Sequence, residues 1–552
     1  MSTRPPLVFK FASEGWEFEE IHRLNYKTFV EEIPQHKASP TQRLVDKFHD
    51  ENTYLIGLSG RKLAGMLAVR GARPFSLDQK LENLDSHLPA GRKVCEIRLL
   101  AVERKFRGAQ VLQGILALLW QHGIEKGYDL AIISGTTKQF KLYHHLGFVP
   151  FGPVVGTGEA QFQPMYVTLE TFESTAREFL RSSPSRSFQA SAVNFLPGPV
   201  TIRREVRRAF EQAPESHRAN GFNKDFKAVK ALLCELTSAR EVELLLGSGT
   251  LANDVVAAQL SLEKSRGLVL SNGEFGERLL DHAHRFGLKF DAFEFPWGQP
   301  IELAAIRKMF GSSQRPGWIW CAHCETSSGV LNDLENLKAL CAEFQVKLCL
   351  DCISSVGTVP VNLSGVHLAS CASGKGLRAY PGLSMVFYNH EIETTGKRLP
   401  RYLDLGYYRS QDGIPFTFSS NLLHALHAAL KRVPWNQHFS ELVELSEWLR
   451  PKLRELGFEL VGDQTSTSPA VMTIALPESL NSVQIGNSVQ ESGYLLSYNS
   501  EYLRKRNWIQ ICLMGESSKE KLVSLLSALN RVCFRRALPK APVETEAKVR
   551  SR

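Results

Sequence analysis

Residue types with clear chemical potential fall in four short segments of the second half of the chain. These are residues 247–250 (GSGT), 271–276 (SNGEFG), Asp351 and residues 373–376 (SGKG), and each follows an apolar run that predicts a strand. A glycine-rich turn before a helix lets backbone N–H groups bind an anion, and a lysine among small residues can be desolvated into a nucleophilic amine. Because ligands of open α/β sheets bind at the carboxyl ends of the strands, we expect these segments to form one site.

Each segment also has an ordinary structural interpretation when it is taken alone. The glycines can simply make a turn, Phe275 can pack on the core, Asp351 can cap the following helix, and Lys375 can be a solvated side chain. The order of the segments favours chemistry instead. An anion loop, an aromatic ring, an aspartate and a lysine are the parts that hold pyridoxal phosphate, since they bind its phosphate, stack on its ring, keep its pyridine nitrogen protonated and form its Schiff base.

Residues from about 194 to 532 resemble the class V, fold type I aminotransferases that use pyridoxal phosphate, of the alanine–glyoxylate and 2-aminoethylphosphonate–pyruvate transaminase group. The matching motifs are residues 194–199 (NFLPGP), 216–218 (SHR), 272–278 (NGEFGER), 323–329 (HCETSSG) and 351–357 (DCISSVG). The resemblance implies that Lys375 carries the cofactor and moves the substrate proton, with Asp351 on the ring nitrogen and Phe275 on the ring face. It also implies a homodimer and a further set of cofactor-binding residues, namely Ser248, Gly249, Thr250, Thr326, Ser327, Ser373 and Thr417, the last reaching the neighbouring subunit's phosphate.

The sequence departs from this family pattern at two positions. Gln510 stands where the family carries an arginine that grips the substrate carboxylate, and a neutral amide cannot replace a charge-assisted fork. Arg378 is a candidate substitute for that grip, and a surface arginine is the equal alternative. The glutamine that commonly precedes the lysine is replaced by Gly374. We therefore expect the cofactor to bind, while the usual pair of α-amino acid and α-keto acid is in question.

A second constellation lies in the first half of the chain. Residues 96–102 (EIRLLAV) predict a strand, and residues 107–112 (RGAQVL) lead into a helix whose first backbone amides could hold a pyrophosphate. Together with residues 141–148 (KLYHHLGF) they resemble GNAT-fold acyltransferases over residues 9–169. The resemblance implies that Val102, Arg107 and Gly108 bind the pyrophosphate of coenzyme A and that Tyr143 is the general acid toward the leaving thiolate. Gln110 and Leu112 stand where that family usually has small residues.

The segment of residues 72–92 is similar to acyl-amino-acid and acyl-homoserine-lactone synthases, which implies an acyl-CoA or an acyl carrier protein thioester as donor. Glu96 could then activate the acceptor amine as a base, and the alternative is a strand-end carboxylate paired with Arg98 or Lys105. His144 and His145 are expected on a helix surface, and no metal site is expected because no third ligand accompanies them.

Composition bounds the class of protein. The 552 residues suggest three to four structural units, and 43% apolar with 22% charged residues indicate a globular protein with a mild net charge of +9. The sequence shows no basic stripe typical of nucleic-acid binding and no apolar run long enough to cross a membrane. The pairs Cys321/Cys324 and Cys349/Cys352 lie in strand-like runs, which favours buried thiols over a metal or redox site and indicates a reduced, cytoplasmic protein.

The fold class expected is α/β, with the serine- and arginine-rich residues 181–188 marking a linker. The predicted organisation is a GNAT-like mixed α/β domain (1–180), a linker (181–192), a large cofactor domain with a mostly parallel sheet (193–420), a small C-terminal α/β domain (421–535) and a basic, disordered tail (536–552). Predicted strands cover residues 53–58, 62–69, 94–102, 130–134, 242–246, 267–271, 317–322, 346–351 and 383–388, with helices over 111–124, 251–262 and 334–344.

These observations predict a bifunctional enzyme. One half would transfer an amino group between small-molecule amines and keto or aldehyde compounds, and the other would acylate an amine related to these substrates. The alternative is a pyridoxal-phosphate lyase or desulfurase whose degenerate GNAT domain serves as a binding or regulatory module.

Overall fold

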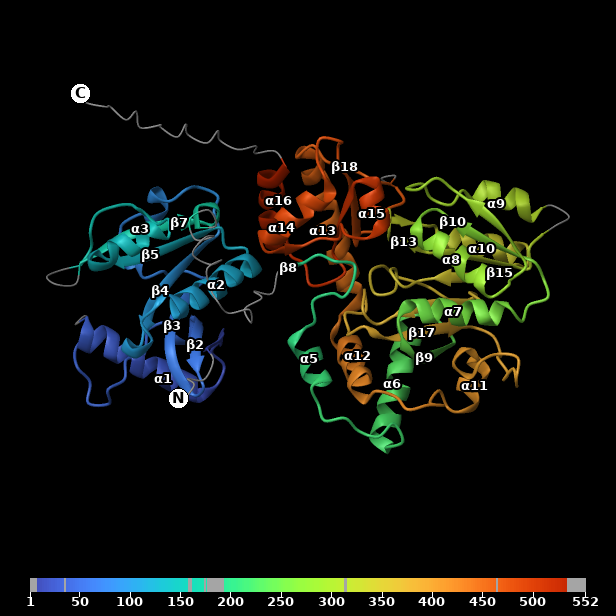
Figure 1. Cartoon of the computed structure of the whole chain (residues 1–552), viewed down its shortest axis with the longest axis horizontal. Coiled ribbons are helices and arrows are strands. Elements are labelled where there is room, and N and C mark those ends of the chain that lie inside the picture. The colour runs from blue at the N-terminus through green and yellow to red at the C-terminus, as the bar shows by residue number, and fades with distance from the viewer. Residues whose placement is uncertain are drawn as a thin grey trace, which may run out of the picture. The chain divides into compact units, whose positions relative to one another are not determined.

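The computed structural model describes residues 7–33, 36–156, 161–172, 175, 193–311, 315–462 and 465–533. The chain divides into two compact units, of which the first comprises Met1–Val193 with the short segment Glu520–Leu525 and the second Asn194–Lys519 with Leu526–Arg552 (Figure 1). The predicted linker (181–192) and basic tail (536–552) lie outside the described residues.

The N-terminal unit is built on one seven-stranded sheet. Its strands are, in spatial order, β1 (Leu7–Phe11), β2 (Thr53–Ser59), β3 (Lys62–Arg70), β4 (Val94–Val102), β5 (Leu130–Thr136), β7 (Phe162–Thr168) and β6 (Val149–Pro150). All neighbours are antiparallel except β4 and β5. The parallel pairing of β4 with β5 joins Val94–Glu96 to Leu130–Ile132 only, so the later residues of both strands are left to line a cavity.

A bulge in β4 shapes the same region. Leu99 has a φ of +52°, and the register between β3 and β4 shifts between Met66 and Ala68. A bulge bends its strand, and here it falls where β4 parts from β5. The helices of this unit are α1 (Gly15–Tyr26), the π-helical turn η1 (Lys27–Glu32), α2 (Ala109–Lys126) and α3 (Phe140–His145). The predicted strands and helix of the first half are confirmed within two or three residues at their ends.

The main sheet of the C-terminal unit is mostly parallel, as predicted. Its spatial order is β11 (Phe290–Glu294), β10 (Gly267–Ser271), β12 (Trp318–Ala322), β15 (Lys347–Asp351), β16 (Leu368–Ala372), β17 (Gly382–Tyr388) and β9 (Glu241–Gly247). Only β17 runs antiparallel to its neighbours. The segment with Lys375 was expected to follow a strand, but no predicted range covers β16, because its small residues (LASCA) give a weak strand signal. The edge strand β11 was not predicted either, since its apolar residues alternate with acidic ones.

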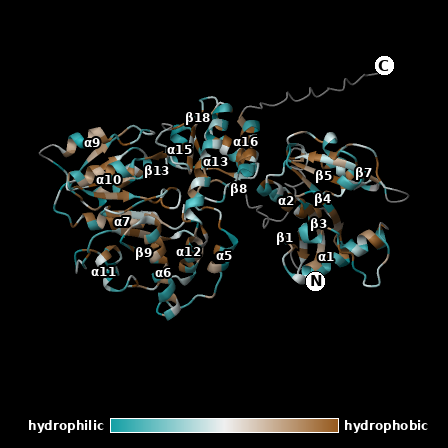
Figure 2. Cartoon of the chain, turned by 180° about the vertical axis from the view of Figure 1, so that it is seen from behind, coloured by the Kyte–Doolittle hydropathy of each residue, from teal (hydrophilic) through white to brown (hydrophobic). Residues whose placement is uncertain are grey.

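The central strands of this sheet are buried on both faces, which explains why most of them read as apolar runs. Leu244 and Leu270 point into one core, while the adjacent Leu245 and Val269 point into the other. The first core is covered by α6, α10 and α12 and the second by α7 and α8. Brown, hydrophobic residues accordingly mark the strands in Figure 2. The large helices are α5 (Arg204–Phe210), α6 (Asn220–Thr237), α7 (Gly249–Leu260), α8 (Glu274–Arg285), α9 (Leu303–Phe310), α10 (Leu334–Glu343), α11 (Leu405–Ser410), α12 (Ser420–Arg432) and α13 (Trp435–Glu455).

A smaller three-stranded sheet follows in the same unit. It consists of β18 (Glu459–Leu460), β19 (Val471–Ala475) and β21 (Trp508–Cys512), with α14 (Ser482–Glu491), α15 (Glu501–Arg506) and α16 (Lys519–Cys533). Short pairs β13 (Cys324–Glu325) with β14 (Val330–Leu331) and β8 (Val193–Asn194) with β20 (Tyr494–Leu495) complete it. All ten cysteines are free thiols and nine are buried, including both CxxC pairs, as predicted. Within the described residues, no helix combines the length and apolarity that a membrane span requires.

Candidate active sites

Lys375 lies in the turn that follows β16, among the loops at the carboxyl ends of the parallel strands. Its Nζ donates a hydrogen bond to Ser354 Oγ at 2.9 Å and lies 5.1 Å from the centre of the Phe275 ring. Burial lowers the pKa of the Lys375 amine, and the carboxylate of Asp351 opposes part of this shift. A lysine with a lowered pKa is more often unprotonated and therefore more nucleophilic.

Asp351 ends β15 and is almost fully buried, at 6% exposure. One carboxylate oxygen accepts a hydrogen bond from Asn253 Nδ2 at 2.9 Å and the other from the backbone N–H of Ile353 at 2.9 Å. Asn253 is itself held by Ser370, whose hydroxyl donates to Asn253 Oδ1 at 2.6 Å. Asn253 was not predicted as a site residue, because no local pattern in the sequence indicates its hydrogen bond with Asp351, 98 positions later.

Phe275 stands at the start of α8, where it presents its ring toward Lys375. A buried carboxylate fixes this helix start, because Glu325 accepts hydrogen bonds from the backbone N–H groups of Phe275 at 3.3 Å and Gly276 at 3.0 Å. Ser327 adds its backbone N–H at 3.1 Å and its hydroxyl at 2.5 Å to the same carboxylate. Burial raises the pKa of Glu325, although these donors oppose the shift. Glu325 therefore positions the aromatic ring.

The predicted phosphate loop lies where α7 begins. Ser248 precedes the helix, Gly249 is its first residue, and the side chains of Ser248 and Thr250 are exposed. A Cβ on Gly249 would come within 2.5 Å of Ile353 Cδ1, so this backbone packs directly against the loop after Asp351. The unpaired N–H groups of a helix start are suited to an anion.

Three further predicted cofactor residues have partners of their own. The hydroxyls of Thr326 and Ser354 share a short hydrogen bond, which links Thr326 to Lys375. Ser373 is engaged within its turn, because its hydroxyl donates to the Tyr380 carbonyl at 2.6 Å and accepts from Leu383 N–H at 3.2 Å. Thr417 is exposed between α11 and α12, and its contact with a neighbouring subunit's phosphate stays a prediction.

Gln510 is completely buried in β21. Its Nε2 donates to the carbonyl oxygens of Thr326 at 2.6 Å and Ser327 at 3.1 Å and lies 2.8 Å from Thr473 Oγ1. Its Oε1 accepts from the hydroxyl of Tyr502 at 3.2 Å. The amide that replaces the expected arginine is therefore used to join β21 to the loop that carries Thr326.

Arg378 was considered either as a substitute grip for the substrate carboxylate or as a surface arginine. It is not on the surface, since it is 7% exposed. Its Nε donates to the Met514 carbonyl at 3.1 Å and one Nη to the Gly515 carbonyl at 2.8 Å. The missing glutamine before the lysine also has a structural reason. A Cβ on Gly374 would lie 2.9–3.0 Å from Pro381 atoms, so this backbone accepts only glycine without a shift.

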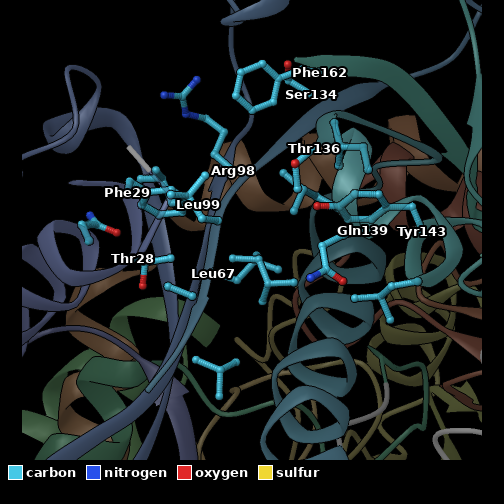
Figure 3. Close-up of a pocket in the computed structure, with 18 of the residues that line it drawn as sticks. Thr28, Phe29, Leu67, Arg98, Leu99, Ser134, Thr136, Gln139, Tyr143 and Phe162 are labelled. Atoms are coloured by element: carbon cyan, nitrogen blue, oxygen red, sulfur yellow. The ribbon is translucent and has the colours of Figure 1, made fainter. Parts of the chain in front are cut away.

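The N-terminal unit contains a cavity of about 1320 Å³ between the separated parts of β4 and β5. Figure 3 shows Thr28, Phe29 and Leu99 on one side of it and Thr136, Gln139 and Tyr143 on the other. Apolar side chains form much of its lining, among them Leu67, Leu112, Leu116, Ile133, Leu146 and Phe148. Among the predicted residues, Glu96, Val102, Arg107, Gly108 and Tyr143 all line this one cavity.

Glu96 is buried at 1% exposure, and its carboxylate accepts hydrogen bonds from the backbone N–H of Ser76 at 2.8 Å and from the Ser76 hydroxyl. Arg98 lies 3.4 Å from Glu96 and 2.7 Å from Asp46. Burial acts to raise the pKa of Asp46, but the Arg98 guanidinium outweighs it and the pKa is lowered. Of the two pairings foreseen for Glu96, the structure shows the one with Arg98. Ser76 and Asp46 were missed.

Tyr143 lies on α3, with its ring against Gly135 of β5, where a Cβ would approach to 2.8 Å. Burial raises the pKa of the Tyr143 hydroxyl, and a hydrogen bond from the backbone of Thr136 opposes the shift. The phenol therefore remains protonated at neutral and mildly alkaline pH and can donate a proton. His144 and His145 on the same helix are exposed, as predicted.

Arg107 and Gly108 lie at the start of α2, close to the end of β4. Arg107 Nε donates to the Val102 carbonyl at 3.1 Å, and its guanidinium also pairs with Glu32 of η1, which Arg104 contacts at 3.1 Å. Burial acts to raise the pKa of Glu32, but the two arginines lower it. Gly108 precedes the helix in an extended conformation, which leaves the backbone N–H groups of the helix start directed outward.

Comparisons with known proteins find relatives of both units. The family model of the N-acyl amino acid synthase FeeM matches residues 20–166. The soluble hydrogenase 42 kDa subunit of Anabaena cylindrica is 30% identical over 297 residues, which are 51% of this chain and 78% of that protein. The 2-aminoethylphosphonate–pyruvate transaminase of Burkholderia thailandensis is 29% identical over 322 residues, 54% of this chain and 86% of that protein.

A solved structure extends the comparison to the fold. The alanine–glyoxylate aminotransferase from Nostoc sp. is similar with a TM-score of 0.58 at 26% identity, over 64% of this chain and 98% of that chain. The matched part, 64% of this chain, corresponds in length to the C-terminal unit. The chain therefore belongs to the class V, fold type I family of pyridoxal-phosphate-dependent aminotransferases, and it joins such an enzyme to an N-terminal domain of the N-acyl amino acid synthase family.

Proposed function

We propose that the protein is a bifunctional enzyme in which Lys375 carries pyridoxal phosphate for amino transfer and the N-terminal cavity acylates a related amine. One observation carries the aminotransferase part. A buried amine with a lowered pKa lies 5.1 Å from an aromatic ring and shares its pocket with a fixed aspartate. Sequence alone could order these groups along the chain, and it is their convergence that supports the proposal.

The residues present fit pyridoxal phosphate. The start of α7 at Ser248–Thr250 suits its phosphate, Phe275 suits its ring and Asp351 suits its pyridine nitrogen. When bound through Lys375, the cofactor supplies an electron sink for the carbon that bears the amino group.

The chain's own residues then hold and move protons. Asn253 and the Ile353 N–H fix the carboxylate of Asp351, so that it stays directed at its partner. Ser354 accepts a hydrogen bond from Lys375 Nζ and so fixes the orientation of the amine. In the neutral amine this orients the nitrogen lone pair, and in the protonated amine it orients the remaining N–H groups. Once displaced by the substrate amine, the lysine is free to act as general base and general acid at the substrate carbon.

In the N-terminal unit we assign Glu96 as the base that takes a proton from the acceptor amine and Tyr143 as the acid that protonates the leaving thiolate. Arg107 and the N–H groups after Gly108 suit a pyrophosphate, and the apolar lining suits the acyl chain. For that anion to bind, Arg107 must exchange Glu32 for the phosphate. The donor is an acyl-CoA or an acyl carrier protein thioester, and the acceptor is an amine.

A covalent test decides the first half of the proposal. The full-length protein is incubated with pyridoxal phosphate, reduced with borohydride and analysed by peptide mass spectrometry. We expect the reduced adduct on Lys375 and none in Lys375→Ala, while Lys347→Ala, a surface control paired with Glu263, retains it. An adduct elsewhere, or none, would refute the assignment. Acyl transfer from a panel of acyl thioesters to amines tests the second half, and its absence would favour a binding or regulatory N-terminal domain.

We further propose a homodimer in the cytoplasm. The exposed position of Thr417 and the phosphate loop of a second copy are the parts that such a dimer would bring together. Ten free thiols suit a reducing compartment. Light scattering of the purified protein measures the dimer, and loss of cofactor affinity in Thr417→Val tests the shared site.

A further inference from the structure

The position of Gln510 in the site around Lys375 restricts what kind of amine this site accepts. Gln510 Nε2 has two hydrogens, and three acceptors of the protein already surround it. Its Oε1 is taken by Tyr502. With no exposed surface and every hydrogen bond used, this amide is not available to a substrate.

The buried Arg378 and the half-buried Arg450 of the same unit are equally committed. Arg378 donates to the carbonyls of Met514 and Gly515. Arg450 donates from Nη2 to the carbonyls of Ser468 and Val471 at 2.8 and 3.1 Å and from Nε to Ser446 Oγ at 3.0 Å. Both guanidinium groups hold the backbone together, which is a structural use.

The groups that most strongly affect the pKa of the Lys375 amine, apart from burial itself, are acidic or neutral. They are the carboxylates of Asp351 and Glu325 and the thiols of Cys324 and Cys512. Both thiols have a pKa raised to about 12 by burial, so they are neutral. The guanidinium of Arg278 lies 4.9 Å from the centre of the Phe275 ring, but it is paired with Glu274 at 2.9 Å. A carboxylate on the reacting carbon would therefore find no uncommitted cation among these described groups, whereas an uncharged substituent needs none.

We propose that the aminotransferase unit takes primary amines whose amine-bearing carbon has no carboxylate, together with the corresponding aldehydes or ketones as amino acceptors. This inference rests on the proposed function and narrows its substrate class. The exchange is balanced: the donor R–CH₂–NH₂ loses its C–N bond and becomes R–CHO, while the acceptor R′–CHO gains that nitrogen and becomes R′–CH₂–NH₂. No external oxidant or reductant is needed, because donor and acceptor exchange two electrons through the cofactor.

The test compares pairs that differ only by the carboxylate, ethylamine with L-alanine and 2-phenylethylamine with L-phenylalanine. In the holoenzyme, the rate of the change in cofactor absorbance is measured for each donor alone. In cofactor-loaded Lys375→Ala, which cannot turn over, the Kd of each amine is measured by titration of the same absorbance. We expect the carboxylate-free member to bind and react at least about tenfold better, as loss of one charge-assisted pair predicts.

The outcomes separate the two proposals. Tighter binding or faster reaction of the α-amino acids would overturn the inference and leave the aminotransferase function standing, and it would point to a cation from another subunit. If none of the four compounds changes the absorbance, the proposed function fails and the inference fails with it. A folded double variant with both Gln510→Arg and Cys512→Gly should shift the preference toward the α-amino acids. An unchanged preference would contradict the inference that Gln510 excludes the substrate carboxylate. Circular dichroism shows whether the double variant folds. If it does not fold, the comparison of the four compounds with the unmodified protein decides the inference alone.

Discussion

Replacement of Gln510 by leucine should destabilise the C-terminal unit although no charge is removed. The substitution keeps the side-chain size nearly constant but leaves the Thr326 carbonyl without its donor and the Tyr502 hydroxyl without its acceptor. The Ser327 carbonyl keeps the Thr473 hydroxyl, which donates to it at 3.2 Å. Two orphaned groups at about 1–3 kcal/mol each, offset by about 1 kcal/mol from the added apolar side chain, give a loss of about 3 kcal/mol.

Urea unfolding followed by tryptophan fluorescence measures this loss, since six of the eight tryptophans lie in the C-terminal unit. Gln484→Leu is the matched control, because Gln484 is exposed on α14 of the same unit and its replacement should change the free energy of unfolding by less than about 0.5 kcal/mol. Gln510→Leu should also weaken cofactor binding, since it loosens the loop that joins Thr326 to Ser354 and Lys375. Equal midpoints for the two variants would refute the structural role that we give to Gln510.

Three other perturbations probe single contacts. Tyr143→Phe should lower kcat for acyl transfer by about 100-fold, as loss of a general acid does, with the thioester KM little changed; an unchanged kcat would remove Tyr143 from the mechanism. Asn253→Ala should weaken cofactor binding by about tenfold, because it frees one oxygen of Asp351 and removes about 1.5 kcal/mol, and a titration of cofactor absorbance that shows wild-type affinity would count against this positioning role. Burial lowers the pKa of His323 to about 4, so only the unfolded chain takes up a proton between pH 6.5 and 4. This histidine should contribute a loss of about 3 kcal/mol of stability as pH drops through that window. Burial also lowers the pKa values of His122, His367 and His438, to about 4, 3 and 4, so these residues add to the slope and His323→Leu should reduce it by the share of His323 alone in urea titrations.

Much of the C-terminal fold could be predicted because its strands are buried on both faces. An uninterrupted apolar run such as residues 318–322 (WIWCA) identifies a parallel-sheet strand without knowledge of its neighbours. The rule for ligands at strand ends then brought Asp351 and Lys375 together in advance. The rule requires only that each segment follows a strand of the parallel sheet in the chain. The prediction for Lys375 was therefore possible although no predicted range covers β16, the strand that precedes it.

The partners that orient these residues could not be predicted in the same way. Asn253 meets Asp351 across 98 positions and Glu32 meets Arg107 across 75, so neither contact leaves a local pattern in the sequence. The departure at Gln510 was visible, but its meaning was not. A missing arginine reads as a lost function until the structure shows which carbonyls the amide binds.

In both halves of the chain, the polar or cationic side chains that could bind a substrate carboxylate are already hydrogen-bonded or paired within the protein. Gln510 and Arg378 are consumed by the backbone, and in the N-terminal cavity both ends of the Arg98 guanidinium are held by carboxylates, Asp46 at 2.7 Å and Glu96 at 3.4 Å. A substrate carboxylate would compete with these two anions for Arg98, whereas an amine without a carboxylate can approach Glu96 without disturbing the pair. If the aminotransferase unit releases an amine without a carboxylate, the acyltransferase unit can accept it on electrostatic grounds, and this compatibility gives the fusion of the two units a chemical reason.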